Sequence, residues 1–140
     1  AAAIAGRDLE VVVKCDTGRK RAGVETPGEA VELAKLIAGS KGLTFAGFLM
    51  YPPEDGWERT QTFLDTANAG LRDVGLEAGI ISTGGSPNIP NIGKLKGATE
   101  HRAGTSIFND RMQVAAGVAS LEDCALTVYA TVVSRAGPER

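Results

Sequence analysis

Residues 9–51 read LEVVVKCDTGRKRAGVETPGEAVELAKLIAGSKGLTFAGFLMY, and this stretch decides the fold. Its opening residues, 9–14, are rich in β-branched side chains and precede a polar, glycine-containing loop, so they predict a buried strand. Thr26, Pro27 and Glu29 then form a capping-box signature with a proline at the first helical position. Apolar residues follow at helical spacing up to Ile37, which predicts a helix that buries one face.

The chain continues to alternate between strands and helices. Residues 43–51 predict a second strand, which Pro52-Pro53 must end. An apolar stripe from Thr60 to Val74, with Gly75 as its C-cap, predicts a longer helix. Shorter candidates for strands follow at residues 79–83, 98–102 and 105–108. Residues 125–134 (ALTVYATVVS) alternate between apolar and polar side chains and form the clearest predicted strand. This order is typical of parallel β/α units with right-handed crossovers.

Length and composition limit the class of protein. A chain of 140 residues allows one domain and is too short for a complete β/α barrel, which needs roughly 250 residues. The net charge of −2 argues against a nucleic-acid partner. No apolar run approaches the ~20 residues of a transmembrane helix, and the N-terminal residues do not resemble a signal peptide. Cys15 and Cys124 form neither a disulfide framework nor a metal motif, so we expect packing roles and a reducing cytoplasm.

Functional groups of α/β folds lie on the loops that leave the carboxyl ends of the strands. Residues 82–88 (STGGSPN) combine hydroxyls with glycines, so their backbone N–H groups could surround a phosphate, although a plain turn has the same composition. Residues 16–23 carry Arg19, Lys20 and Arg21 on a glycine-flanked loop, which predicts either cations over a ligand or a solvated charged loop.

Two other strand ends carry candidate groups. Tyr51 is an acid/base group, a stacking surface or a packed tyrosine with a satisfied hydroxyl. Arg102 stands close to Gly104 and is either aimed inward or solvated. His101 is the only histidine, so it is more typical of a structural or exposed residue than of a catalytic one, and it cannot build a multi-histidine metal site.

Five segments in this order resemble the fold-type III pyridoxal-phosphate enzymes, in particular the branch of D-threonine aldolase and eukaryotic-type D-serine dehydratase, which are relatives of alanine racemase. The segments are VVVKCDTGRKRAGV (11–24), TPGEAVELAKLIAGSKGLTFAGFLMY (26–51), STGGSP (82–87), TEHRAGTSIFND (99–110) and LEDCALTVYATVVSRAGPER (121–140). The resemblance implies that residues 1–120 form the C-terminal half of a TIM-type (β/α) barrel. Residues 121–140 would then begin a β-domain with its first strand.

The resemblance also implies roles for individual residues. Arg21 would contact the pyridine ring of the cofactor, and Tyr51 would lie beside that ring as the candidate catalytic group. The phosphate would be held by Ser82, Thr83, Gly84 and Gly85, with Arg102 and Gly104 completing the rim. The sequence departs from the family pattern at Ala103, where the family usually has proline, at Ser106, where it often has tyrosine, and at Pro52-Pro53.

The family's cofactor-binding lysine would precede Ala1, and the ligands of its divalent metal would follow Arg140. The resemblance therefore implies part of a pyridoxal-phosphate-dependent lyase for small D-amino acids of the 3-hydroxy type, which cleaves or dehydrates them and is inactive as this chain alone. The alternatives are an alanine-racemase-like or cofactor-carrier protein, and a non-catalytic phosphate-binding or assembly module. Because a partial barrel has open sheet edges, we expect self-association or pairing with the remainder of the barrel.

Overall fold

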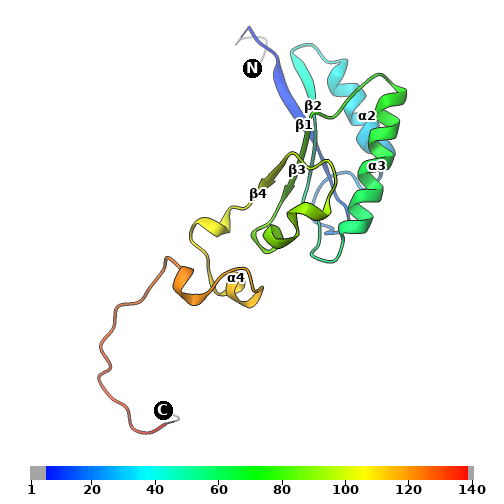
Figure 1. The fold of residues 1–140 in the computed structure, drawn as a ribbon. Coiled ribbons are helices and arrows are strands. Elements are labelled where there is room, and N and C mark those ends of the chain that lie inside the picture. The colour runs from blue at the N-terminus through cyan, green and yellow to red at the C-terminus, as the bar shows by residue number, and fades with distance from the viewer. Residues whose placement is uncertain (1–5, 139–140) are drawn as a thin grey trace.

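The computed structural model describes residues 6–138. Its centre is a parallel sheet whose strand order follows the chain, β1-β2-β3-β4. The strands span Leu9–Cys15, Leu43–Met50, Ile80–Gly84 and Glu100–Arg102, and the main helices are α2 (Pro27–Ala38) and α3 (Trp57–Asp73). Both helices lie side by side on one face of the sheet (Figure 1). The predicted parallel β/α organisation is confirmed.

Helix α2 begins where the capping signature predicts. The backbone N–H of Glu29 donates to Thr26 Oγ1 at 3.2 Å, and the backbone N–H of Thr26 donates to Glu29 Oε2 at 3.1 Å. These two bonds satisfy donors that the first turn of a helix otherwise leaves free. Pro27 costs nothing here, because its missing N–H lies at a position without an intrahelical acceptor.

The core lies between the sheet and the two helices. Phe48, Met50 and Ile81 project from the strands, and α3 contributes an apolar stripe that ends at Leu71. Full burial of a side chain of this size contributes about 1.5–3 kcal/mol. Val74, which the sequence analysis placed in the stripe, is 42 % exposed because the helix has already ended at Asp73.

An irregularity between β1 and β2 sets the register of the strands. Val11 pairs with Phe45, but Val12 pairs with Gly47, so β2 holds one extra residue at this point. Gly47 has φ 150°, and a Cβ there would collide with the backbone of Ile80. Only glycine fits this bulge, because the neighbouring strand approaches it too closely for any side chain.

Two expectations from the sequence are wrong. Residues 105–108 are not extended, since Thr105–Ile107 form a short 3₁₀ helix, η2. Residues 125–134 form no strand, and within the described chain they lie in an extended, exposed segment that projects away from the body (Figure 1). Alternating side chains favour a strand only where a neighbouring strand accepts its hydrogen bonds, and no strand of residues 6–138 lies beside this segment.

Three further elements were not predicted from the sequence: the 3₁₀ helix η1 (Ser86–Lys94), the short helix α4 (Arg111–Ala115) and the 3₁₀ helix η3 (Leu121–Asp123). Among the residues that the structure describes, no helix has the length and apolar character needed to cross a bilayer.

Candidate functional site

The carboxyl ends of the strands surround a cavity of about 420 Å³. The loops after β1, β2, β3 and β4 all contribute to it, and α4 closes one side. The lining residues are Lys14, Arg21, Tyr51, Gly85, Ser86, Pro87, Arg102, Gly104, Thr105, Asp110, Met112 and Gln113. The structure therefore brings together five residues that the sequence analysis selected: Arg21, Tyr51, Gly85, Arg102 and Gly104.

The other three predicted residues, Ser82, Thr83 and Gly84, do not line the cavity. Ser82 is 1 % exposed and Thr83 is fully buried, so neither side chain reaches the cavity. Thr83 faces the opposite side of the sheet, where its hydroxyl contacts His101. Ser82 Oγ accepts a hydrogen bond from Arg102 Nε at 2.8 Å. A Cβ on Gly84 would lie 3.0 Å from the Arg102 guanidinium, so this glycine leaves room for the arginine. Direct contact of these three residues with a phosphate stays a prediction.

Arg102 is held from two sides. Besides its bond to Ser82, it donates from Nη2 to the backbone carbonyl of Met50 at 2.9 Å. These bonds join the ends of three strands and fix the guanidinium at the rim of the cavity. A positive group fixed in this way needs little further ordering when it binds an anion.

Tyr51 directly follows β2 and is positioned by its neighbours. The guanidinium carbon of Arg19 lies 4.0 Å from the centroid of the Tyr51 ring, and Arg19 is itself held by an ion pair with Glu54 at 2.8 Å. Gly85 has φ 106°, and a Cβ there would collide with the ring. The absence of a side chain at Gly85 therefore lets the diglycine turn pack directly against Tyr51.

Asp16 shapes the loop that carries Arg21. Its carboxylate accepts hydrogen bonds from the backbone N–H groups of Gly18, Lys20 and Arg21, at 2.9, 3.0 and 2.6 Å. Desolvation acts to raise the pKa of Asp16, but the backbone hydrogen bonds outweigh it and hold that pKa below its ordinary value. The loop is therefore ordered by a charged group, and it presents Arg21 to the cavity.

Lys14 and Gln113 are among the lining residues of the cavity that were not selected from the sequence. Lys14 lies on the same sheet face as Leu49, and its position at the end of the first strand was a usable signal. Gln113 lies on α4, is 4 % exposed, and has a side-chain oxygen without a hydrogen-bond partner among residues 6–138. No signal pointed to Gln113, because α4 itself was not predicted.

The remaining candidates lie outside the cavity. Cys15 is buried in the core, and burial raises the pKa of its thiol to about 12, so it stays protonated at neutral pH. Within the described part of the chain, no three His, Cys, Asp or Glu residues come together as a metal-binding group.

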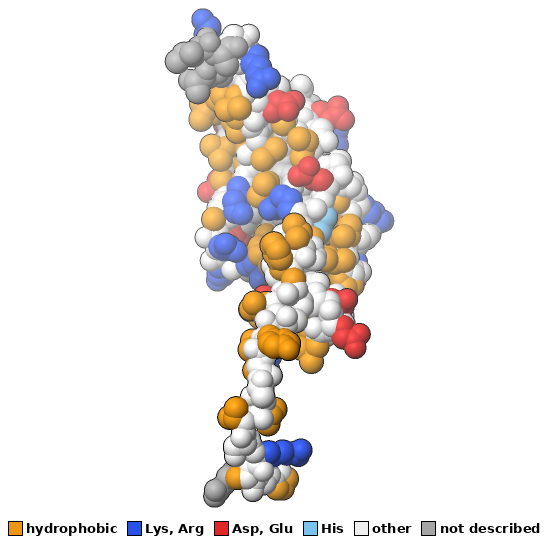
Figure 2. Space-filling view, turned by 90° about the vertical axis from the view of Figure 1, so that its left-hand side faces the viewer, with side chains coloured by type: hydrophobic (Ala, Val, Ile, Leu, Met, Phe, Trp, Pro, Cys, Tyr) orange, Lys and Arg blue, Asp and Glu red, His pale blue; other side chains and the backbone are white. Residues whose placement is uncertain are grey.

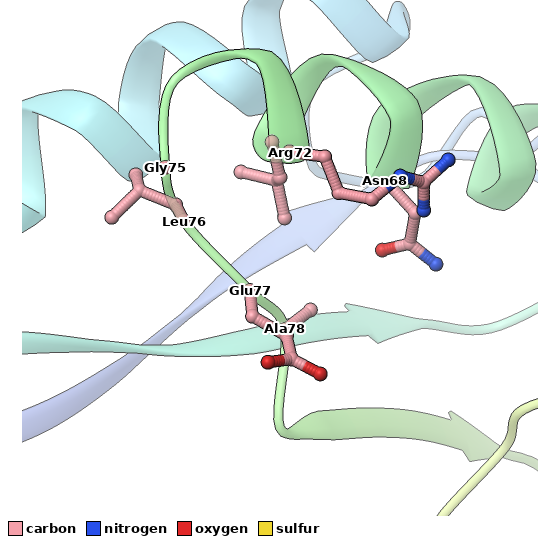
Figure 3. A pocket seen from close by; sticks show the side chains of 7 residues that line it. Asn68, Arg72, Gly75, Leu76, Glu77 and Ala78 are labelled. Carbon is pink, nitrogen blue, oxygen red and sulfur yellow. The ribbon is translucent and has the colours of Figure 1, made fainter.

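A second hollow, of about 480 Å³, is lined by the end of α3 and the loop that leads into β3 (Figure 3). Asn68 and Arg72 project from the helix, and Glu77 lies across from them on the loop. This hollow precedes β3, whereas the cavity with the basic residues lies where the strands end. The rule for α/β folds therefore favours the 420 Å³ cavity as the functional site.

A parallel sheet with loops and basic groups around one cavity is the architecture of a β/α domain, and comparison with known proteins identifies its family. The sequence profile of the alanine racemase N-terminal domain matches residues 1–112. The chain belongs to this family, whose members are fold-type III pyridoxal-phosphate enzymes.

Individual relatives show which enzymes of this family the chain is similar to. The chain is 31 % identical to D-threo-3-hydroxyaspartate dehydratase of Delftia sp. (strain HT23), over 91 % of its length and 37 % of the relative. It is 33 % identical to 3-hydroxy-D-aspartate aldolase of Paracoccus denitrificans, over 58 % of the chain and 24 % of the relative. The structure of D-threonine aldolase from Filomicrobium marinum matches with a TM-score of 0.74 and 26 % identity, over 96 % of this chain and 40 % of that one. One structure of the Delftia dehydratase is a variant in the metal-free form. The chain thus spans less than half the length of each relative.

Proposed function

We propose that this chain forms the cofactor-binding part of a pyridoxal-phosphate-dependent lyase that acts on D-3-hydroxy amino acids by aldol cleavage or dehydration. The observation that carries the proposal is the cavity at the strand ends, where Lys14, Arg21 and Arg102 surround Tyr51 and the diglycine turn. The names of the similar enzymes support the substrate class. The chain order of the four strands supports an arc of a β/α barrel, which we propose to be its C-terminal half.

The residues at the cavity fit pyridoxal phosphate. The cavity volume of about 420 Å³ lies within the ~300–1,000 Å³ that small-molecule sites occupy. Three basic side chains on one rim complement a phosphate dianion, and the unpartnered side-chain oxygen of Gln113 can accept a hydrogen bond from a donor on the ligand. Gly85 brings the backbone close to the cavity beside Tyr51, where a Cβ would collide with the ring.

When bound, the cofactor supplies an electron sink for bonds at the α-carbon of an amino acid. In our proposal Arg102 and the backbone around Gly85 hold the phosphate end, and Arg21 contacts the pyridine ring. Tyr51 lines the same cavity, and its hydroxyl is the group we assign to proton transfer. The cation–π contact with Arg19 and the packing against Gly85 restrict its ring to one orientation.

We further propose that the 140-residue chain binds the cofactor but does not turn over substrate. We assign no lysine of this sequence to the family's cofactor-binding position. We also assign none of its residues as a ligand of the divalent metal of the related enzymes. Turnover of D-threonine or D-threo-3-hydroxyaspartate by the purified chain would contradict this part of the proposal.

The test measures binding of pyridoxal phosphate by equilibrium dialysis. Wild type should bind saturably, and Arg102→Met should weaken binding about tenfold, because a charge-assisted hydrogen bond is worth roughly 1.5–3 kcal/mol. Arg72→Met, in the second hollow, is the matched control and should bind as wild type does. Equal affinity of Arg102→Met and wild type, or no binding by wild type, would overturn the assignment of the site.

A further inference from the structure

The imidazole of His101 bridges Thr83, in strand β3, and Gly85, in the turn that follows it. Its Nδ1 lies 2.8 Å from Thr83 Oγ1, and its Nε2 lies 3.1 Å from the backbone oxygen of Gly85. A carbonyl oxygen only accepts, so Nε2 donates to Gly85, while Nδ1 lies within hydrogen-bond distance of the threonine hydroxyl. The side chain therefore acts as a strut between a fully buried threonine and the diglycine turn.

The strut lies on the face of the sheet opposite the cavity. Successive residues of a strand point to opposite faces, and Arg102, the next residue in β4, lines the cavity. His101 is in register with Thr83 and is not among the lining residues. The Gly85 carbonyl that it binds is therefore turned away from the cavity.

The orientation of the Gly85 carbonyl also fixes the direction of the Ser86 N–H. Peptide bonds in the described chain are trans, so the N–H of Ser86 points opposite to the Gly85 carbonyl. That carbonyl also accepts from the Asn88 N–H at 2.9 Å, so two donors hold the peptide plane. Ser86 lines the cavity, and its N–H has no acceptor among residues 6–138.

We propose that His101 is a positioning residue, which holds the Gly85–Ser86 peptide so that the Ser86 N–H donates to an anionic oxygen in the cavity. The proposal rests on the proposed function in that the anion is the phosphate group of the cofactor. Without the imidazole, only the Asn88 bond restrains the peptide, and the Ser86 N–H is free to turn away from the ligand.

The experiment uses inorganic phosphate and pyridoxal phosphate as probes and the backbone amide of Ser86, followed by NMR, as the readout. In wild type both probes should shift the Ser86 resonance. His101→Leu should lose this response and bind pyridoxal phosphate about fivefold more weakly, whereas binding of pyridoxal, which lacks the phosphate, should not change.

Two amide variants separate positioning from general stability. The side-chain amide of His101→Gln reaches the position of Nε2 and should restore the Ser86 response. That of His101→Asn reaches only the position of Nδ1, keeps the contact with Thr83, and should behave like leucine. Circular dichroism identifies any variant that fails to fold, and rescue by glutamine alone is a pattern that a merely structural histidine does not produce.

The outcomes distinguish the two proposals. A Ser86 amide that responds to neither probe in wild type, or that responds equally in wild type and His101→Leu, overturns the role of His101. A Ser86 amide that responds to phosphate in wild type and not in His101→Leu, in a chain that does not bind pyridoxal phosphate, supports the role of His101 and overturns the proposed function.

Discussion

At the scale of single residues, Asp16 shows how one carboxylate organises a loop. Three backbone N–H groups converge on it, and their hydrogen bonds place Arg21 at the cavity. Because the pKa of Asp16 is lowered by folding, the folded chain binds fewer protons than the unfolded chain near that pKa. The stabilisation is therefore present above the unfolded value of about 3.9 and is lost as the pH falls through the lower, folded value.

We predict that Asp16→Asn lowers the melting temperature at pH 7, because a neutral amide oxygen accepts these bonds less strongly. The difference between variant and wild type should begin to shrink as the pH falls below about 4, where Asp16 of the unfolded chain takes up its proton, and should disappear below the lower pKa of the folded chain. Thermal unfolding at pH 7, 4 and 3 measures this. Asp55→Asn is the control, since the Asp55 carboxylate accepts no hydrogen bond within the described chain. A difference that does not depend on pH would refute the role of the charge.

At the scale of elements, the two long helices begin in different ways. Helix α2 has a complete capping box. Helix α3 has Gly56 as its N-cap, without a side-chain hydrogen bond, and depends on its buried apolar stripe. Tertiary packing supplies most of the stability of a helix in a protein, but a cap satisfies donors that packing cannot reach.

We expect Thr26→Ala to destabilise the chain by about 1 kcal/mol, because it removes the acceptor for the Glu29 N–H. Thr26→Ser should retain most of the stability. The matched control is Thr62→Ala on the exposed side of α3, where loss of a bond to the Glu58 carbonyl is offset by the higher helix propensity of alanine. Urea denaturation compares the three, and a Thr26→Ala variant as stable as wild type would refute the contribution of the cap.

The elements that the sequence predicted are those with a strong local pattern. The capping box, the β-branched run of β1 and the proline pair after β2 each restrict the backbone by themselves, and the structure confirms them. Helix η1 contains Pro87, Pro90 and Gly93, residues that are usual in loops, so its 3₁₀ bonds depend on the packing of Asn88 against Gly84 and Pro52. Residues 125–134 have the alternating pattern of a strand but no neighbouring strand within the described chain, and the alternation alone does not provide the hydrogen-bond partners that a strand needs.

The candidate site was predictable to the extent that it lies at strand ends. Arg21, Tyr51 and Arg102 were found because parallel strands bring their carboxyl ends together. Gln113 and the strut of His101 were not found, since both depend on turns whose geometry no periodic pattern encodes. For the same reason Ser82 and Thr83 were expected at the ligand, although Ser82 is buried under Arg102 and Thr83 is buried on the opposite face of the sheet.

At the scale of the whole molecule, the chain leaves apolar surface uncovered. Figure 2 views the face of the sheet opposite the helices, where hydrophobic side chains are visible around a group of basic ones. On the C-terminal segment Val128, Tyr129 and Val133 are 87 %, 104 % and 93 % exposed. Exposed apolar residues in an extended segment favour pairing with another strand.

We predict that the 140-residue chain associates with a second copy at micromolar concentration. Replacing Val128 and Val132 together by lysine should reduce association, because both lie on the apolar side of the alternating segment. Replacing Thr127 and Thr131 by lysine adds the same charge on the other side and serves as the control. Light scattering over a concentration series measures the mass, and a monomer at every concentration would disprove the prediction.

The strand order also bears on how the chain acquires its fold during translation. Each strand of the sheet pairs with the one made just before it, so a ribosome releases every new strand next to a partner that is already present. Pairings between neighbours in sequence close short loops, which favours rapid folding over sheets with distant partners. The cavity is an exception, because its rim combines residues from the first strand and from α4. We infer that the sheet forms progressively as the chain emerges, whereas the binding site is completed in a late step.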